Sequence, residues 1–162
     1  MRATALSLVI IAGAAALEGV LAGRGIRARF GELRLPRFSP PLAAWVIIGI
    51  GYYVVCYVIL RRLLTAGLTS SLETVAFSLL ILLMLANAGW GLLFFRRKDV
   101  RASFLAFFPY GLLALGLAAV LMRLDQVAAL TLVPYLIYLI YATWWAYRLW
   151  RLNAVYANRR GR

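Results

Sequence analysis

Aromatic side chains with hydrogen-bonding groups gather in the last apolar stretch of the chain, LTLVPYLIYLIYATWWAYRLWRLN (130–153). Tyr135, Tyr138, Ala142, Trp145 and Leu149 follow one another at spacings of three and four, which places them on one face of an α-helix. Such a face is flat and apolar, with hydroxyl and indole N–H groups at its edge, and it suits a planar apolar ligand. The same face can equally be the packed side of a membrane helix.

A second candidate group surrounds Asn87 in the third apolar stretch. Trp90 follows three residues later and Phe94 four beyond that, so the three side chains share a helix face. An amide left unpaired in lipid costs several kcal/mol. Asn87 must therefore face another helix, a water molecule or a ligand. A helix–helix hydrogen bond with packed tryptophan is the alternative to a ligand site.

A third group is the proline-rich segment PRFSPP (36–41), which Trp45 and Tyr53 follow. It closes the longest connection, GRGIRARFGELRLPRFSPP (23–41), whose three prolines forbid a continuous helix. We expect this connection to fold back over the helix ends as a lid, with a solvated linker as the alternative. The lid is favoured because four large side chains give the segment an apolar side: Phe30, Leu33, Leu35 and Phe38.

Several kinds of catalytic chemistry are excluded within one chain. Histidine is absent and Cys56 is the only cysteine, so intrachain disulfides, His-ligated zinc or haem, and Ser-His or Cys-His catalysis have no residues to use. Glu18 lies near the end of the first apolar stretch, and a carboxylate within a span is a candidate functional group. We expect it instead at the membrane interface, within reach of Arg24 or Arg27.

The elements that position these groups follow from hydropathy. The chain has 162 residues and is 65% hydrophobic, well above a soluble domain. Each of five apolar segments is long enough to cross a bilayer, and helix is the only state that satisfies the backbone there. The sequence predicts an all-α integral membrane protein, a bundle of five transmembrane helices forming one domain (1–162), with helices at about 3–22, 42–60, 74–95, 102–122 and 126–147.

Two shorter features constrain this bundle. The connection Arg123-Leu124-Asp125 is so tight that the helices on either side must be antiparallel neighbours. Pro134 removes one backbone donor, and we expect it to kink the fifth helix or to start it. The first segment resembles a signal peptide, but its apolar run is longer than usual and we favour a retained helix.

The charge distribution predicts orientation. There are 18 Lys and Arg against 5 Asp and Glu, a net charge of +13, and the basic residues lie between the apolar blocks. We attribute this pattern to the orientation of the protein in the membrane and to contact with anionic lipid. It does not indicate nucleic-acid binding, because no nucleic-acid-binding module is visible in the sequence. Most basic residues fall in the first and third connections and in the tail. The positive-inside rule then predicts the N-terminus outside and the C-terminus inside, in a membrane that we expect to be a bacterial cell membrane.

Taken together and in order, these groups resemble the TspO/MBR family, the tryptophan-rich sensory proteins related to the mitochondrial translocator protein. The resemblance covers about 30–153. The lid segment and second helix match at Phe30, Leu33, Leu35, Pro36, Phe38, Pro40, Pro41 and Tyr53. The third and fifth helices match at Asn87, Trp90, Phe94, Phe95, Pro134, Tyr135, Leu136, Ala142, Leu152 and Asn153.

The departures from the family pattern concern tryptophans. Arg29 stands where the family has its loop tryptophan, Gly49 where the second helix has a cavity tryptophan, and Tyr138 where the fifth helix has one. Ala146 replaces a family asparagine. In the family the missing pocket tryptophans are linked to light-dependent porphyrin breakdown, so their replacement argues against that activity here. Gly49 is expected to enlarge the cavity.

The resemblance implies a membrane receptor, sensor or carrier that binds porphyrin- or haem-type tetrapyrroles or sterol-like lipids beneath the first loop, usually as a homodimer. No obligatory cofactor is implied, and porphyrin or haem enters as a ligand. A membrane enzyme acting on a porphyrin, carotenoid or lipid, and a structural subunit of a membrane complex, are the alternatives. The expected ligand-binding residues are Pro40, Pro41, Trp45, Gly49, Tyr53, Asn87, Trp90, Phe94, Tyr135, Tyr138, Ala142 and Trp145.

Overall fold

The computed structural model describes the backbone of residues 1–160 and the side chains of residues 1–154. Within that part of the chain every regular element is a helix, and five helical stretches are long and apolar enough to cross a membrane. The predicted five-helix membrane bundle is confirmed. The elements are α1 (Arg2–Ala22), α2 (Ile26–Glu32), α3 (Leu42–Ala66), α4 (Ser71–Gly91), the π-helical turn η1 (Leu92–Arg96), α5 (Val100–Leu105), α6 (Phe107–Leu124) and α7 (Gln126–Arg160).

The helices begin and end at local signals in the sequence. Ser70 and Glu73 form a capping box at the start of α4, where each side chain accepts a hydrogen bond from the other residue's backbone N–H. Gly67 ends α3 with a positive φ of 90°, a conformation that favours glycine. The predicted end of this helix at residue 60 is wrong, because the helix continues to Ala66. The connection to α4 is therefore only four residues, 67–70.

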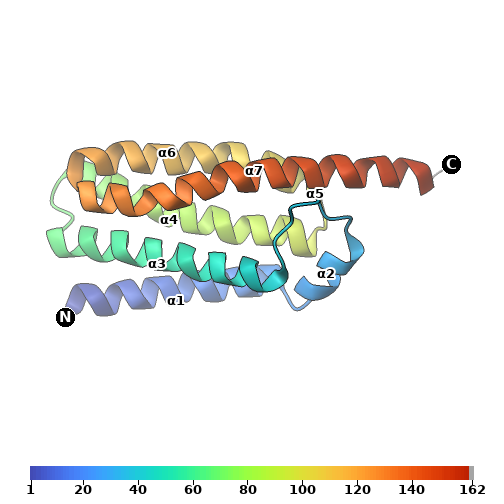
Figure 1. Ribbon diagram of the computed structural model, residues 1–162. Coiled ribbons are helices and arrows are strands. Elements are labelled where there is room, and N and C mark those ends of the chain that lie inside the picture. The colour runs from blue at the N-terminus through green and yellow to red at the C-terminus, as the bar shows by residue number, and fades with distance from the viewer. Residues whose placement is uncertain (161–162) are drawn as a thin grey trace.

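The connection 23–41 contains a helix that was not predicted. The short helix α2 fills residues 26–32, ahead of the prolines, and the backbone from Leu33 onward is non-helical until α3 begins after Pro41. The prediction that the prolines prevent a continuous helix holds, and the segment does lie against the ends of the other helices (Figure 1). Pro134 lies inside α7, eight residues after its start, so it does not begin that helix.

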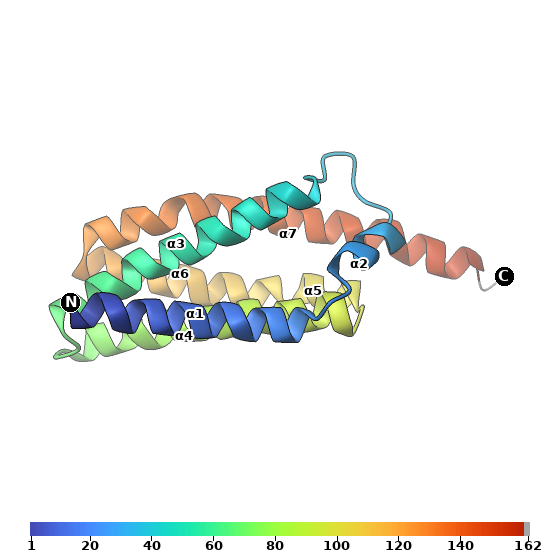
Figure 2. The same ribbon diagram turned by 90° about the horizontal axis from the view of Figure 1, so that it is seen from below.

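The bundle is packed unevenly along its length. At the end that carries the N-terminus, α3, α4, α6 and α7 enclose a core of fully buried leucine, isoleucine and alanine side chains, among them Leu60, Leu80, Leu117, Leu121 and Leu132. Toward the other end α3 diverges from α1, as Figure 2 shows. That end carries α2, α5 and the C-terminus (Figure 1). One half of the bundle is therefore a closed core, and the other half has room for a cavity.

A single residue, Asp125, makes the turn between α6 and α7, which pack side by side (Figure 1). Its carboxylate accepts hydrogen bonds from the backbone N–H groups of Val127 and Ala128 at 3.0 and 3.2 Å, and it also binds the Arg62 guanidinium on α3. The hydrogen bond from Arg62 lowers the pKa of the Asp125 carboxyl. Asp125 thus caps α7 and ties it to α3.

Substitution of Asp125 should separate these two roles. Asp125→Ala removes the cap and the ion pair and should cost about 1 kcal/mol from the cap alone, a fall in melting temperature of roughly 2–4 °C in detergent. Asp125→Asn keeps a capping oxygen, so it should lower the melting temperature by less than Asp125→Ala. Because the folded-state pKa is lowered, the wild type should gain stability from the ionised group above about pH 4 and lose it as the pH falls further. An equal loss in both variants would contradict this division.

Candidate functional site

A cavity of about 420 Å³ opens between α1, α3, α4, α6 and α7 in the less tightly packed half of the bundle. Ile26 and Phe30 of α2 contribute to its wall, so the segment 23–41 closes one end. The volume lies within the range of roughly 300–1,000 Å³ typical of small-molecule sites. Nine of the twelve residues proposed from the sequence line it: Trp45, Gly49, Tyr53, Asn87, Trp90, Tyr135, Tyr138, Ala142 and Trp145.

The other three proposed residues lie outside the cavity wall. Pro41 is the N-cap residue of α3 and Pro40 precedes it, so the proline pair positions the start of that helix. Phe94 is almost fully buried behind Trp90, and the two rings stack with centroids 4.8 Å apart and planes 9° apart. In the lid it is Ile26 and Phe30, and not the prolines, that face the cavity.

The aromatic face of α7 is both a cavity wall and a packing surface, the two alternatives that its sequence left open. Tyr135, Tyr138, Ala142 and Trp145 line the cavity, whereas Leu149 is fully buried in a small cluster with Phe94 and Trp145. The face therefore forms a cavity wall along most of its length and a packing surface at its last turn.

Rings from α3 extend this wall. The Trp45 ring lies 4.8 Å from Trp145 and 6.5 Å from Tyr138, centroid to centroid. Deeper in the bundle the Tyr52 ring lies 4.9 Å from Tyr135. These separations are typical of aromatic pairs in protein interiors. The result is a nearly continuous aromatic surface from the lid toward the middle of the bundle.

A carboxylate lies in the cavity wall opposite this surface. Glu18 Oε2 accepts a hydrogen bond from the Tyr53 hydroxyl at 2.5 Å and another from Asn87 Nδ2 at 2.8 Å. The expectation that Glu18 reaches Arg24 or Arg27 at the interface is wrong. Residue 18 lies one turn before the end of α1, and the cavity extends to it. Asn87 thus binds a side chain on another helix. The hydrogen bonds of Tyr53 and Asn87 to Glu18 join α1, α3 and α4.

The remaining polar atoms of the cavity residues differ in their partners. Trp90 Nε1 donates to the Ser103 carbonyl at 3.0 Å, and Trp145 Nε1 donates to Ser39 Oγ in the lid at 2.9 Å. Trp45 Nε1 is buried and makes no hydrogen bond with any residue whose side chain the structure describes. The Tyr52 hydroxyl is also buried, beside Cys56 and Tyr110. Buried polar groups are usually paired, so the Trp45 indole is an exception among the cavity residues.

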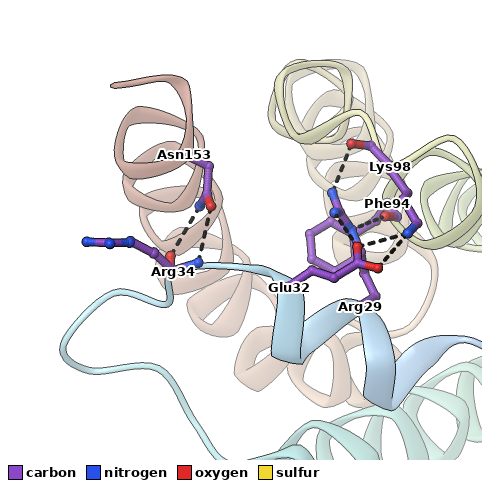
Figure 3. A network of polar contacts seen from close by, with 6 residues as sticks. All are labelled: Arg29, Glu32, Arg34, Phe94, Lys98 and Asn153. Atoms are coloured by element: carbon purple, nitrogen blue, oxygen red, sulfur yellow. Dashed lines mark hydrogen bonds and ion pairs between the residues drawn. The ribbon is translucent and has the colours of Figure 1, made fainter. Parts of the chain in front are cut away.

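The lid is held in place by the buried Arg29, which stands where the family has a tryptophan. Arg29 Nε donates to the Phe94 carbonyl at 3.2 Å and Arg29 Nη2 to the Lys98 carbonyl at 2.9 Å (Figure 3). Both carbonyls belong to the end of η1 and the turn that follows, where helical hydrogen bonding runs out. Glu32 pairs with Arg29 and with Lys98 Nζ, and the hydrogen bond from Lys98 lowers the Glu32 pKa.

The second half of the lid is attached to α7. Asn153 accepts a hydrogen bond from the backbone N–H of Arg34 and donates one to its carbonyl, each at 3.1 Å (Figure 3). The Tyr141 hydroxyl donates to the Phe38 carbonyl at 2.8 Å. The lid thus rests on both the α4–α5 turn and the last helix. Asn153 was identified from the family pattern, but its partner could not be read from the sequence.

The fold and the site together define a small multi-pass integral membrane protein with an aromatic cavity closed by its first connection. A model of the TspO/MBR family matches residues 5–151, nearly the whole chain, and the chain belongs to this family. No curated protein matches it. Membership of this family suggests a membrane sensor or receptor of the TspO type.

Arg29→Gln should loosen the lid. It leaves the Phe94 and Lys98 carbonyls without a charged donor, and a hydrogen bond to a charged group contributes roughly 1.5–3 kcal/mol. Hydrogen exchange of the backbone amides in 26–34 should therefore accelerate in detergent, while amides near Leu80 and Leu117 stay protected. Arg27→Gln is the matched control, because Arg27 is exposed on the same helix. Equal exchange in the two variants would show that Arg29 does not hold the lid.

Proposed function

We propose that this protein is a TspO-like membrane receptor, sensor or carrier that binds a flat apolar ligand in the cavity between its helices. Porphyrin- or haem-type tetrapyrroles and sterol-like lipids are the ligand classes that such a site suits. The observation that carries the proposal is the aromatic wall formed by Trp45, Tyr138 and Trp145 in a cavity of about 420 Å³. Rings at these positions offer large apolar contact areas with little entropy to lose.

One unpaired donor supports binding over simple packing. Trp45 Nε1 carries a desolvation cost without compensation, and a ligand oxygen that reached it would remove that cost. The enzymatic alternative has less support. The one carboxylate among the cavity-lining residues is Glu18, and its Oε2 is engaged by Tyr53 and Asn87.

Filling the cavity tests the proposal. A Cβ atom added at Gly49 meets no atom within 4 Å and Gly49 lines the cavity, so the ring of Gly49→Phe should reduce the space for a ligand. Quenching of tryptophan fluorescence by protoporphyrin in detergent should then show a dissociation constant raised by about tenfold or more, since one to two kcal/mol of contact is displaced. Gly51→Phe is the control, because Gly51 has the same free space but lies exposed on α3, away from the cavity. Weakening by both variants, or by neither, would count against the cavity as the binding site.

We also propose the orientation with the N-terminus outside and the C-terminus inside. The lid, the basic turn 96–101 and the end of α7 lie at one end of the bundle (Figure 1), and the positive-inside rule assigns that end to the cytoplasm. Fusions at the C-terminus should give fluorescent green fluorescent protein and inactive alkaline phosphatase in a bacterial host. The opposite pair of results would reverse the orientation.

The homodimer remains a prediction from the family. It can be measured by the mass of the protein in detergent, after correction for the bound detergent.

A further inference from the structure

One acidic side chain lies in the cavity wall. It is that of Glu18 on α1, and the lining includes no lysine or arginine. The rest of the wall is aliphatic, aromatic or neutral polar. A carboxylate in such surroundings is costly unless it is paired with a cation or fully hydrogen-bonded.

The hydrogen bonds that hold Glu18 leave half of the carboxylate unused. Both donors, the Tyr53 hydroxyl and Asn87 Nδ2, bind Oε2. No residue that the structure describes donates to Oε1. The two donors are neutral, so they fix the direction of the carboxylate without balancing its charge. Glu18 therefore presents an oriented acceptor to the cavity.

The protein's own cations are engaged elsewhere or lie outside the cavity. Arg29 and Lys98 pair with Glu32 beneath the lid, and Arg62 pairs with Asp125 at the opposite end. Arg24 and Arg27 are exposed and do not line the cavity. The ion pairs among the described residues leave Glu18 without a basic partner. A basic group on a ligand would therefore complement this carboxylate.

We propose that the cavity selects a flat apolar molecule that carries a protonated amine, with its N–H donating to Glu18 Oε1. This inference rests on the proposed function and names the ligand class of the same site. The apolar body would lie along Trp45, Tyr138 and Trp145. Trp45 precedes Tyr53 by eight residues on α3, a rise of about 12 Å, so the amine and the far edge of the ring system are separated by about that length. Ligands that place a carboxylate near Glu18 are disfavoured by like charge.

Three matched probes test the proposal in wild-type protein: a sterol with its 3-hydroxyl group, the same skeleton with a 3-amino group, and the same skeleton with a 3-carboxyl group. Each is titrated against tryptophan fluorescence in phosphatidylcholine nanodiscs at neutral pH, with empty nanodiscs as the correction for partitioning. A charged hydrogen bond in a dry site should make the amine bind at least about tenfold tighter than the alcohol. The carboxylate should bind more weakly than the alcohol.

A variant identifies the residue responsible. Glu18→Gln keeps the shape and removes the charge, and the ratio of amine to alcohol affinity should fall to about one. Glu73→Gln is the matched control, since Glu73 caps α4 away from the cavity and glutamine also serves in a capping box. This control should keep the wild-type ratio.

The outcomes separate this proposal from the proposed function. Equal affinities for the three probes in the wild type, or tighter binding of the carboxylate, would overturn the amine preference and leave the apolar site standing. A preference for the amine that survives in Glu18→Gln would also overturn it. Failure of all three probes to bind would overturn the amine proposal, and protoporphyrin binding in the Gly49→Phe comparison tests the proposed function independently.

Discussion

The Arg29 guanidinium is the contact on which the closed form of the cavity depends. A connection of nineteen residues with three prolines has little regular structure of its own, and only α2 is helical within it. Arg29 fastens α2 to the end of η1 by donating to two carbonyls that the helix leaves unpaired there. Ile26 and Phe30, on the same short helix, then form one end of the cavity wall. This attachment, with the contacts that Asn153 and Tyr141 make to the rest of the segment, keeps the lid over that end of the cavity.

One half of the bundle is a packed core, and the other half contains the candidate ligand cavity. Leucine and alanine side chains around Leu60, Leu80 and Leu121 are packed to full burial, and this half can hold the five helices in register. The cavity lies in the other half, where α3 diverges from α1 (Figure 2), so it does not disturb that packed core. Hydrogen bonds between polar side chains add to the apolar packing there. Glu18, Tyr53 and Asn87 join three helices across the cavity by hydrogen bonds, which are effective in membrane interiors because water does not compete for them.

Much of this arrangement could be predicted from the sequence, because its signals are local. The five spans follow from apolar length, and the cavity faces of α4 and α7 follow from the spacing of Asn87 with Trp90 and of Tyr135 with Trp145. The errors have a different origin. Glu18 looked interfacial because its distance from the helix end was known but its neighbours on α3 and α4 were not. Arg29 looked like the loss of a tryptophan, because its two carbonyl partners lie 65 and 69 residues away. Contacts between residues so far apart in the sequence depend on tertiary packing, and no local sequence pattern predicts them.

The attachment of the lid at Asn153 has a consequence for rates. Its side-chain amide binds both the N–H and the C=O of Arg34, and the Trp145 indole binds Ser39 a little further along. A ligand bound as proposed that leaves beneath the lid must first separate these groups from α7. Such a barrier acts mainly on dissociation. The residence time of a ligand bound as proposed, more than its affinity, then depends on lid contacts such as that of Asn153, which does not line the cavity.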